Sequence, residues 1–340
     1  MVKNNSISIF LILLVVGCSS GPATISNRHG QAIYVVEWKT LSDDSVNHVI
    51  DIAFSPDGKT LASAVYRNPI DENNITLWSI ETGEKIQRVL GEHAVAFSPD
   101  GETLASGSRY GIVRLHSVAT RKLIRMLRGD EMYFSIAFSA DGQMLAGGGS
   151  RGTITLWAVE TGSRVRALTG HSHQIMSIAF SPDGKLLASV SGDGTIKLWS
   201  VETGEELRTL SGRAIAFSPD GEMLATSTGA GSIVFWSVKA GARLRTLKIG
   251  IGNLISSMAF SPDGRFLASN GGRGSVKLWS VQDGHQVQLL SGPMASVTSL
   301  TFSMNGKMLA ACGYDPSIEI WKLEENRKNQ ILPSVDPPNN

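Results

Sequence analysis

The chain has 340 residues, and its 31 Lys and Arg residues almost balance its 30 Asp and Glu residues. A chain with so little net charge has no general attraction for nucleic acid, so we expect no nucleic-acid partner. Its seven His residues are scattered, with no second pair at ligand spacing, so we expect no metal centre.

The first 17 residues have the pattern of a secretory signal peptide. Lys3 precedes an apolar run from Ile7 to Val16, which is shorter than the roughly 20 residues that a membrane-spanning helix needs. The small and aliphatic residues directly before Cys18 resemble the bacterial lipobox, in which the Cys is diacylated and becomes the new N-terminus. The alternative is an ordinary secretory signal with a chance Cys. The resemblance implies a lipid anchor on Cys18.

A lipid on Cys18 implies export to a bacterial cell envelope. Ser19, rather than Asp, follows the Cys, which favours the periplasmic side of the outer membrane if the cell is Gram-negative. Residues 18–30 then form the lipidated Cys and a flexible tether. Because the lipid consumes Cys18, no disulfide is available, and we expect Cys312 to be a small core residue rather than a reactive thiol.

A six-residue stretch recurs along the rest of the chain. It reads AFSPDG from Ala53, Ala96, Ala179, Ala216 and Ala259, AFSADG from Ala137, and TFSMNG from Thr301. Its first half alternates small and large residues, as a strand with two different faces would. Its second half favours a tight turn, because Pro fixes φ, Asp bonds locally and Gly accepts the positive φ that follows. A second apolar run follows each turn, so each copy predicts a hairpin.

The period of this stretch predicts the architecture. Its Phe residues lie 43, 41, 42, 37, 43 and 42 residues apart, and most are followed 19 residues later by Trp. In the fourth unit, Lys185–Ser191, Thr195–Ser200 and the end of Glu202–Gly212 supply three further strands. A four-stranded antiparallel unit repeated at roughly 40–45 residues is typical of a propeller blade. The sequence therefore predicts an all-β, seven-bladed β-propeller over residues 31–332, followed by a disordered tail at 333–340.

These units resemble the WD-repeat β-propeller family over about residues 41 to 323. In that family a His, a Ser, an Asp and a Trp form a buried hydrogen-bonded set within a blade. The resemblance implies such a network in the fourth blade, made by His171, Ser189, Asp193 and Trp199. The other blades depart from the pattern, so we expect most of them to rely on apolar packing. Arg151, Ala230 and Arg273 replace the Asp, Pro293 replaces the seventh blade's His, and His116 replaces the second blade's Trp.

Propellers of this family usually complete one blade with strands from both chain ends, which removes an open sheet edge. We expect Ile33–Leu41 to be the outer strand of the last blade, because it has strand character and precedes the first unit. Asn329–Leu332 is a competing candidate, and the sequence does not decide firmly between the two.

No group of residues predicts an active site. Gly148–Gly152 matches Gly-x-Ser-x-Gly, but that nucleophile turn leads from a strand into a helix, whereas here it joins two strands. The innermost strands offer small or apolar residues and Ser, with Asp51 as their only charge. We therefore expect neither an enzyme nor a cofactor. The rival class is a propeller that binds or converts a small ligand in its central channel.

The remaining candidate is the face formed by the turns between the second and third strands. Arg and Tyr are enriched in interaction hot spots, although solvated turn residues are the alternative interpretation. Five units place one or both there: Tyr66, Arg67, Arg109, Tyr110, Arg151, Arg273 and Tyr314. A long turn after Tyr66 and short connections into the second and fifth units break the symmetry, so we expect docking at the first three units. Because WD-repeat propellers mostly serve as interaction platforms, the resemblance implies a monomeric, non-enzymatic scaffold for other envelope proteins.

Overall fold

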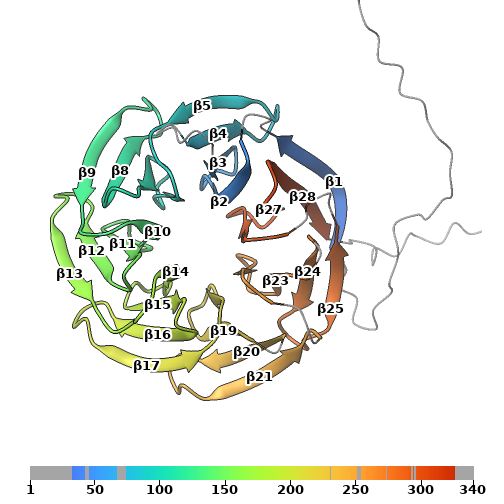
Figure 1. Ribbon diagram of the computed structural model, residues 1–340. Coiled ribbons are helices and arrows are strands. Elements are labelled where there is room, and N and C mark those ends of the chain that lie inside the picture. The colour runs from blue at the N-terminus through green and yellow to red at the C-terminus, as the bar shows by residue number, and fades with distance from the viewer. Residues whose placement is uncertain are drawn as a thin grey trace, which may run out of the picture. The chain divides into compact units, whose positions relative to one another are not determined.

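The computed structural model describes residues 33–42, 46–66, 74–229, 231–250, 254–272, 274–291, 294 and 296–325. For residues 33–38, 66 and 325 only the backbone is described. Within these ranges the chain forms seven four-stranded sheets, which stand around a ring as the blades of a propeller (Figure 1). The predicted all-β, seven-bladed fold is confirmed.

Six blades are built from four consecutive strands each, which follow one another in chain order from the centre of the ring to its rim. Blade 1 contains β2 (His48–Phe54), β3 (Thr60–Tyr66), β4 (Ile75–Ser79) and β5 (Lys85–Val89), and blade 2 contains β6 (Ala94–Phe97), β7 (Thr103–Gly107), β8 (Ile112–Ser117) and β9 (Leu123–Arg128). Blade 3 contains β10 (Tyr133–Phe138), β11 (Met144–Gly149), β12 (Ile154–Ala158) and β13 (Arg164–Leu168), and blade 4 contains β14 (Ile175–Phe180), β15 (Leu186–Ser191), β16 (Thr195–Ser200) and β17 (Glu206–Ser211). Blade 5 contains β18 (Ile215–Phe217), β19 (Met223–Thr228), β20 (Ser232–Ser237) and β21 (Arg243–Lys248), and blade 6 contains β22 (Met258–Phe260), β23 (Phe266–Asn270), β24 (Val276–Ser280) and β25 (Gln286–Leu290).

Blade 7 combines the first described strand of the chain with the last three. From the centre outward it contains β26 (Ser299–Phe302), β27 (Met308–Cys312), β28 (Ser317–Glu325) and β1 (Ile33–Ser42). β1 pairs antiparallel with β28, with Leu41 opposite Ile318. The expectation that Ile33–Leu41 supplies the outer strand of the last blade is confirmed, and the competing segment Asn329–Leu332 lies outside the described residues.

The core consists of apolar layers between neighbouring blades. Trp157 of blade 3 is fully buried and belongs to one cluster with Val113 and Leu127 of blade 2. His116 stands opposite Leu104 in blade 2, as Trp157 stands opposite Leu145 in blade 3, so it does take the Trp position. Burial lowers the pKa of His116, and the neighbouring cation of Arg114 lowers it further.

Cys312 lies in the apolar layer between blades 7 and 1 and is fully buried. Burial raises the pKa of its thiol, with the nearby Asp51 as a second cause. The expected role as a small core residue is confirmed.

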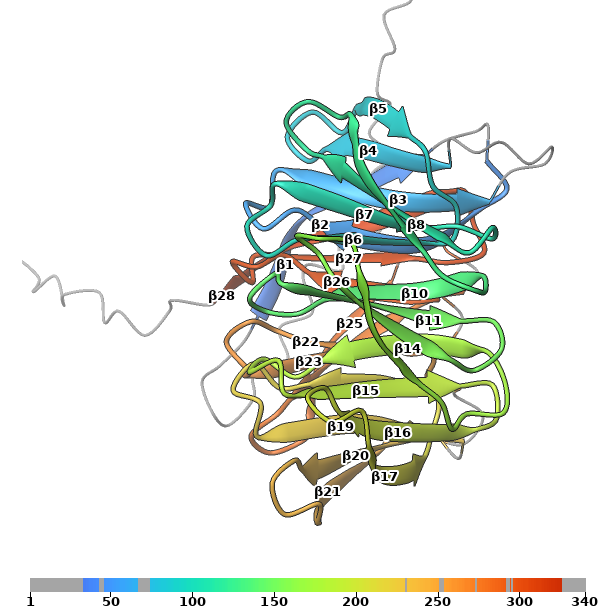
Figure 2. The same cartoon turned by 90° about the vertical axis from the view of Figure 1, so that its left-hand side faces the viewer.

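The recurrent Ser-Pro-Asp-Gly turns close each hairpin and also pack blade against blade. In blade 4 the Ser181 hydroxyl donates to Asp183 Oδ1 at 2.6 Å, and the backbone N–H of Lys185 donates to the same oxygen at 3.1 Å. Gly101 has a φ of +75°, and a Cβ at this position would lie 3.3 Å from Cδ of Pro56 in the preceding blade. These turns lie on one side of the ring, which we call the SPDG face; Figure 2 shows the strands crossing between the two sides.

Cationic side chains tie the rim strands to the following blade. Arg125 on β9 donates to the carbonyl oxygen of Thr161 at 2.8 Å, and Arg166 on β13 donates to that of Thr203 at 2.7 Å. Lys39 on β1 donates to the carbonyl oxygen of Ile80 at 3.0 Å, which places the same kind of contact across the joint between blades 7 and 1. Each contact reaches the turn that precedes the next blade's rim strand.

Candidate interaction face

The candidate face is the side of the ring formed by the turns that join the second strand of each blade to the third. The segments that lead into the innermost strands lie beside these turns. In blade 4, for example, the backbone N–H of Ser172 in the leading segment donates to Asp193 in the turn at 3.0 Å. The Gly148–Gly152 segment begins at the end of β11 and continues into the turn that leads to β12. It therefore joins two strands, as expected. The predicted location of these turns on one face is confirmed.

The four residues expected to form a network in blade 4 are in contact. His171 Nδ1 lies 3.0 Å from Asp193 Oδ2, and His171 Nε2 lies 2.8 Å from the Ser189 hydroxyl. Trp199 Nε1 donates to the same hydroxyl at 2.8 Å. With the imidazole proton on Nδ1, every polar atom of the set has a partner, which fixes the turn to the leading segment.

Burial and hydrogen bonds shift the pKa values of both titratable groups in this network. Burial lowers the pKa of His171, and the opposing effect of Asp193 does not restore it. Burial alone would raise the pKa of Asp193, but hydrogen bonds from Thr195, Ser172 and His171 outweigh it and hold the pKa well below its usual range. A neutral imidazole that donates to a charged carboxylate holds the leading segment to the turn.

In blades 2 and 3 the turn is also bonded to the leading segment, but here the acidic residue lies in the leading segment instead of the turn. Glu92 is 3% exposed, and its Oε2 accepts from the backbone N–H of Arg109 at 3.2 Å and lies 3.3 Å from Arg109 Nε. Glu131 is 8% exposed, and its Oε2 accepts from the backbone N–H of Arg151. Both carboxylates therefore hold the turns that carry predicted interaction residues. The residue pattern of the chain did not single out either Glu.

The other blades, which we expected to rely on apolar packing rather than on the four-residue network, also contain hydrogen bonds that the sequence did not predict. Buried backbone groups need partners, and the chain supplies them with acceptors other than the family's Asp. In blade 6, Asn270 Oδ1 accepts from the backbone N–H groups of Ser256 at 2.9 Å and Ser257 at 3.2 Å. The Trp half of the network also persists in three more blades, as Trp78 to Ser63 at 2.9 Å, Trp236 to Thr226 at 2.9 Å and Trp279 to Ser269 at 3.0 Å.

The structure brings some of the predicted face residues together. The Arg109 guanidinium lies 5.1 Å from the Tyr110 ring centroid, and Tyr110 is 59% exposed. Arg151 is exposed on the corresponding turn of the next blade. Tyr314 is exposed on blade 7, where its ring meets His48 edge-on at 5.7 Å.

The other predicted face residues are not tested. Arg67 and Arg273 lie outside the described residues, and only the backbone of Tyr66 is described, at the end of β3. His93, which no sequence signal marked, adds to the face in blade 2, because its ring lies 5.6 Å from that of Phe134 in blade 3. The described part of the face is therefore concentrated on blades 2 and 3.

Comparison with protein-family models shows where the chain belongs. The model of the WD40 family, described as "WD domain, G-beta repeat", matches seven segments in succession. They are residues 39–79, 85–117, 121–158, 162–200, 204–237, 241–280 and 284–322. The chain belongs to the WD40 repeat family. Each matched segment begins near the rim strand of one blade and ends with the third strand of the next, so the WD40 unit is offset by one strand from the blade. A search of curated proteins finds no match.

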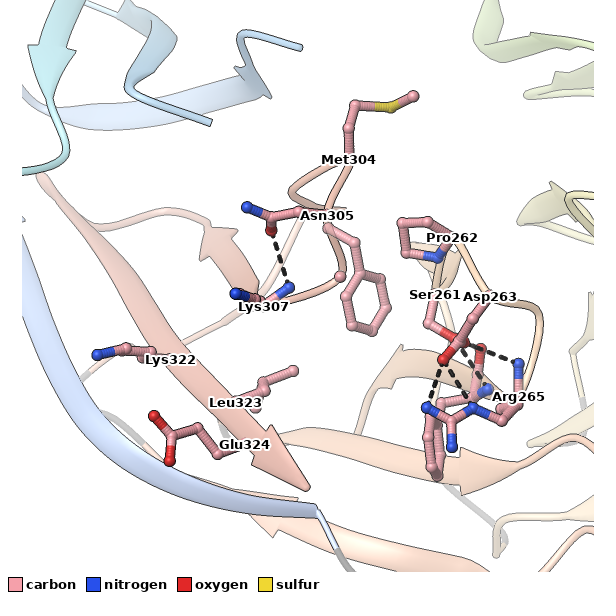
Figure 3. Close-up of a pocket in the computed structure, with 13 residues that line it drawn as sticks. Ser261, Pro262, Asp263, Arg265, Met304, Asn305, Lys307, Lys322, Leu323 and Glu324 are labelled. Atoms are coloured by element: carbon pink, nitrogen blue, oxygen red, sulfur yellow. Dashed lines mark hydrogen bonds and ion pairs between the residues drawn. The ribbon is translucent and has the colours of Figure 1, made fainter. Parts of the chain in front are cut away.

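The WD40 ring also holds a pocket of about 1020 Å³ on its SPDG face, between blades 6 and 7 (Figure 3). Asp263 and Arg265 line one side, and Lys322 and Glu324 line the other. In the other blades a turn follows the third strand, whereas in blade 7 the described part of the third strand, β28, runs on to Glu325 and the rim strand is β1. Asp263 and Arg265 form an ion pair at 2.7 Å, which leaves the pocket with a mixed charge.

The alternative site was the central channel of the WD40 ring, where Asp51 is the one charge expected on the innermost strands. Its carboxylate bonds neighbouring blades to one another. Asp51 lies on β2, where blades 7, 1 and 2 meet. Its carboxylate accepts from the Ser299 hydroxyl at 3.1 Å and from the backbone N–H groups of Val95 at 3.1 Å and Ile52 at 3.0 Å. These contacts tie three blades together and give no support to ligand binding in the channel.

The described residues contain no candidate metal site and no candidate membrane-spanning helix. Within the described ranges, no three His, Cys, Asp or Glu side chains form a group that could hold a metal ion. No helix among the residues that the structure describes is long and apolar enough to cross a bilayer.

Proposed function

We propose that this WD40 propeller is a lipid-anchored, non-enzymatic scaffold of the bacterial cell envelope that holds a partner protein on blades 2 and 3 of the candidate face. WD40 propellers typically serve as protein-interaction scaffolds. The observation that carries the proposal is that two neighbouring turns, held in place by buried Glu92 and Glu131, present exposed Tyr110 and Arg151, with the half-buried Arg109 packed on Tyr110. Arg and Tyr are the residues most often found at the energetic centre of protein interfaces.

The fixed geometry of these turns matters for affinity. Ordering mobile side chains and loops at an interface costs free energy, which weakens binding. The turns after β7 and β11 are already bonded to buried carboxylates, and Arg109 already packs on Tyr110. A partner that docks here meets turns whose backbones are already fixed on folding.

The lipid on Cys18 and the location are parts of the same proposal. Support comes from the apolar run Ile7–Val16 and from the small and aliphatic residues directly before Cys18. Residues 18–30 would serve as the lipidated Cys and tether, with the ring on the periplasmic side of the outer membrane if the cell is Gram-negative. The partners would be other envelope proteins, and the chain would act as a monomer.

The candidate face is tested by replacing its exposed residues. The double variant Tyr110→Ala with Arg151→Ala should reduce cross-linked capture of the partner from solubilised envelopes by about 30-fold or more, because truncation of a hot-spot residue costs about 2 kcal/mol. Its melting temperature should match that of the wild type, because both side chains are exposed.

Met304→Ala is the matched control, because Met304 is 65% exposed on the SPDG face. This variant should capture the partner as the wild type does. Equal capture by the double variant and the wild type would exclude blades 2 and 3 as the docking site.

A further inference from the structure

The rim strand of blade 2 differs from the other rim strands in its exposed apolar side chains. β9 exposes Leu123, Ile124 and Met126, at 38%, 54% and 46%. Each of the other fully described rim strands exposes a single large apolar side chain: Ile86 on β5, Val165 on β13, Leu207 on β17, Leu244 on β21 and Leu289 on β25. An edge strand with a run of exposed apolar residues needs an explanation, because proteins usually protect such edges with charge.

The same strand is also the most basic part of the rim. The eight residues Arg121–Arg128 contain Arg121, Lys122, Arg125 and Arg128 and no acidic residue. The corresponding stretch of blade 4, residues 204–211, contains two Glu and one Arg. Within the part of the chain that the structure describes, none of the four cations on this stretch forms an ion pair.

The backbone at Arg121 adds an independent observation. Arg121 has a φ of +62° and is the only residue other than Gly with a positive φ among those that the structure describes. The corresponding turns of the other blades place Gly at this position, with φ values between +64° and +79°: Gly83, Gly162, Gly204, Gly241 and Gly284. An L-residue is strained in this conformation, and such strain persists most often where it serves a function. Blade 2 therefore carries a cation where the backbone favours Gly.

We propose that the rim of blade 2, Arg121–Arg128, is a contact surface for an anionic phospholipid bilayer. Exposed aliphatic side chains interleaved with Arg and Lys are the combination that binds at the lipid–water interface. The exposed positions of β9 carry no aromatic ring, whereas protein hot spots are enriched in Tyr and Trp. Contact through this rim would hold the ring edge-on to the bilayer (Figure 1) and leave both of its faces open to partners.

The binding test uses a chain that begins at Ser19, so that neither a lipid on Cys18 nor the apolar N-terminal run contributes. Every described strand lies between Ile33 and Glu325, so this chain keeps the whole ring. It should sediment with vesicles of phosphatidylcholine and phosphatidylglycerol, but not with vesicles of phosphatidylcholine alone. Binding should weaken as salt is added, because salt screens the attraction between Arg or Lys and the anionic headgroups.

Three variants assign the binding to β9. Lys122→Glu with Arg128→Glu should lower the affinity for the anionic vesicles by at least about 25-fold, since each lost cation is worth about fivefold. Arg243→Glu with Lys248→Glu on β21 is the matched control and should change the affinity less than about twofold. Arg121→Gly should lower the affinity by about fivefold and yet raise the melting temperature, because Gly relieves the strained φ.

Equal sedimentation with both kinds of vesicle, or equal loss in the β9 and β21 variants, would overturn the proposal. If vesicles do not bind but the β9 variant loses an envelope protein that the wild type captures, the strand belongs to a protein interface and the proposal is wrong. The vesicle tests leave Tyr110 and Arg151 unchanged, and the Tyr110→Ala with Arg151→Ala variant is scored on protein capture, so failure here is separable from failure of the proposed scaffold function.

Discussion

The buried carboxylates of Glu92 and Glu131 show how single residues hold the candidate face. Each accepts from a backbone N–H group in the turn that carries Arg109 or Arg151. In blade 4 the direction is reversed, because Asp193 sits in the turn and accepts from Ser172 in the leading segment. Both arrangements join the turn to the leading segment through a carboxylate that accepts from a backbone N–H group, and the chain can supply this acceptor from either side.

The sequence predicted the Asp193 network but not the roles of Glu92 and Glu131, because the two Glu residues share no spacing. The blade 4 network follows the spacing of its family, so His171 and Asp193 could be predicted. Glu92 directly follows Gly91, whereas Glu131 lies two residues after Gly129, so no common spacing marks the two Glu residues. Their role depends on the path of the leading segment, which residue spacing alone does not determine.

Asp51 makes the stability of the ring depend on pH. Burial raises its pKa from 3.8 to about 6, although three hydrogen bonds oppose the shift. The folded chain therefore binds this proton more tightly than the unfolded chain, and the resulting stabilisation is lost as the pH rises through about 6. Between pH 7 and pH 5 the wild type should gain about 1 kcal/mol relative to Asp51→Asn.

This prediction is checked with urea unfolding of both chains at the two pH values. The comparison cancels the other titrating groups, such as His171 and Asp193, because both chains contain them. The same pH dependence in the wild type and in Asp51→Asn would show that Asp51 does not have the raised pKa.

At the scale of the element, the Ser-Pro-Asp-Gly turn suggests a stabilising substitution. Gly184 has no heavy atom within 4 Å of a Cβ built on it, whereas Gly101 and Gly221 meet a Pro of the preceding blade. Blade 3 has Ala140 where those blades have Pro, yet its turn makes the same Ser139 to Asp141 hydrogen bond. Ala140→Pro should raise the free energy of unfolding by about 0.5–1 kcal/mol, because it presets φ and fills the gap.

Urea unfolding measures the effect of Ala140→Pro, with Ala140→Ser as a control that leaves φ unrestricted. We expect a higher midpoint for the Pro variant alone. A lower midpoint would mean that the blade 3 turn does not share the geometry of its neighbours.

The rim contacts show how far periodicity can predict an element. Arg125, Arg166, Arg208 and Arg245 lie 41, 42 and 37 residues apart, which are the same intervals as those of the Phe residues. The period could therefore have marked these Arg residues as equivalent. The partners of Arg125, Arg166 and Arg245 are backbone carbonyl oxygens of the next blade, and a residue pattern carries no sign of such a partner.

At the scale of the whole molecule, the repeat predicted the ring, and the closing joint needed the structure. Seven units with a period near 42 residues leave few alternatives to seven blades. The sequence left two candidates for the closing strand, and the pairing of β1 with β28 decides for Ile33–Leu41. The pocket between blades 6 and 7 lies beside this joint, where the described part of β28 runs on to Glu325 and lines it with Lys322, Leu323 and Glu324.

The most direct test of the anchored scaffold is photo-cross-linking in living cells. A photoreactive residue replaces Tyr110 on the candidate face or, as a control, Met304 on the SPDG face, and the adducts are followed into carbonate-washed membranes. We predict a defined protein adduct from position 110 and none from position 304, with the adduct lost from the membranes in a Cys18→Ser chain. An adduct from position 304 alone, or a Cys18→Ser chain that stays in washed membranes, would contradict the account.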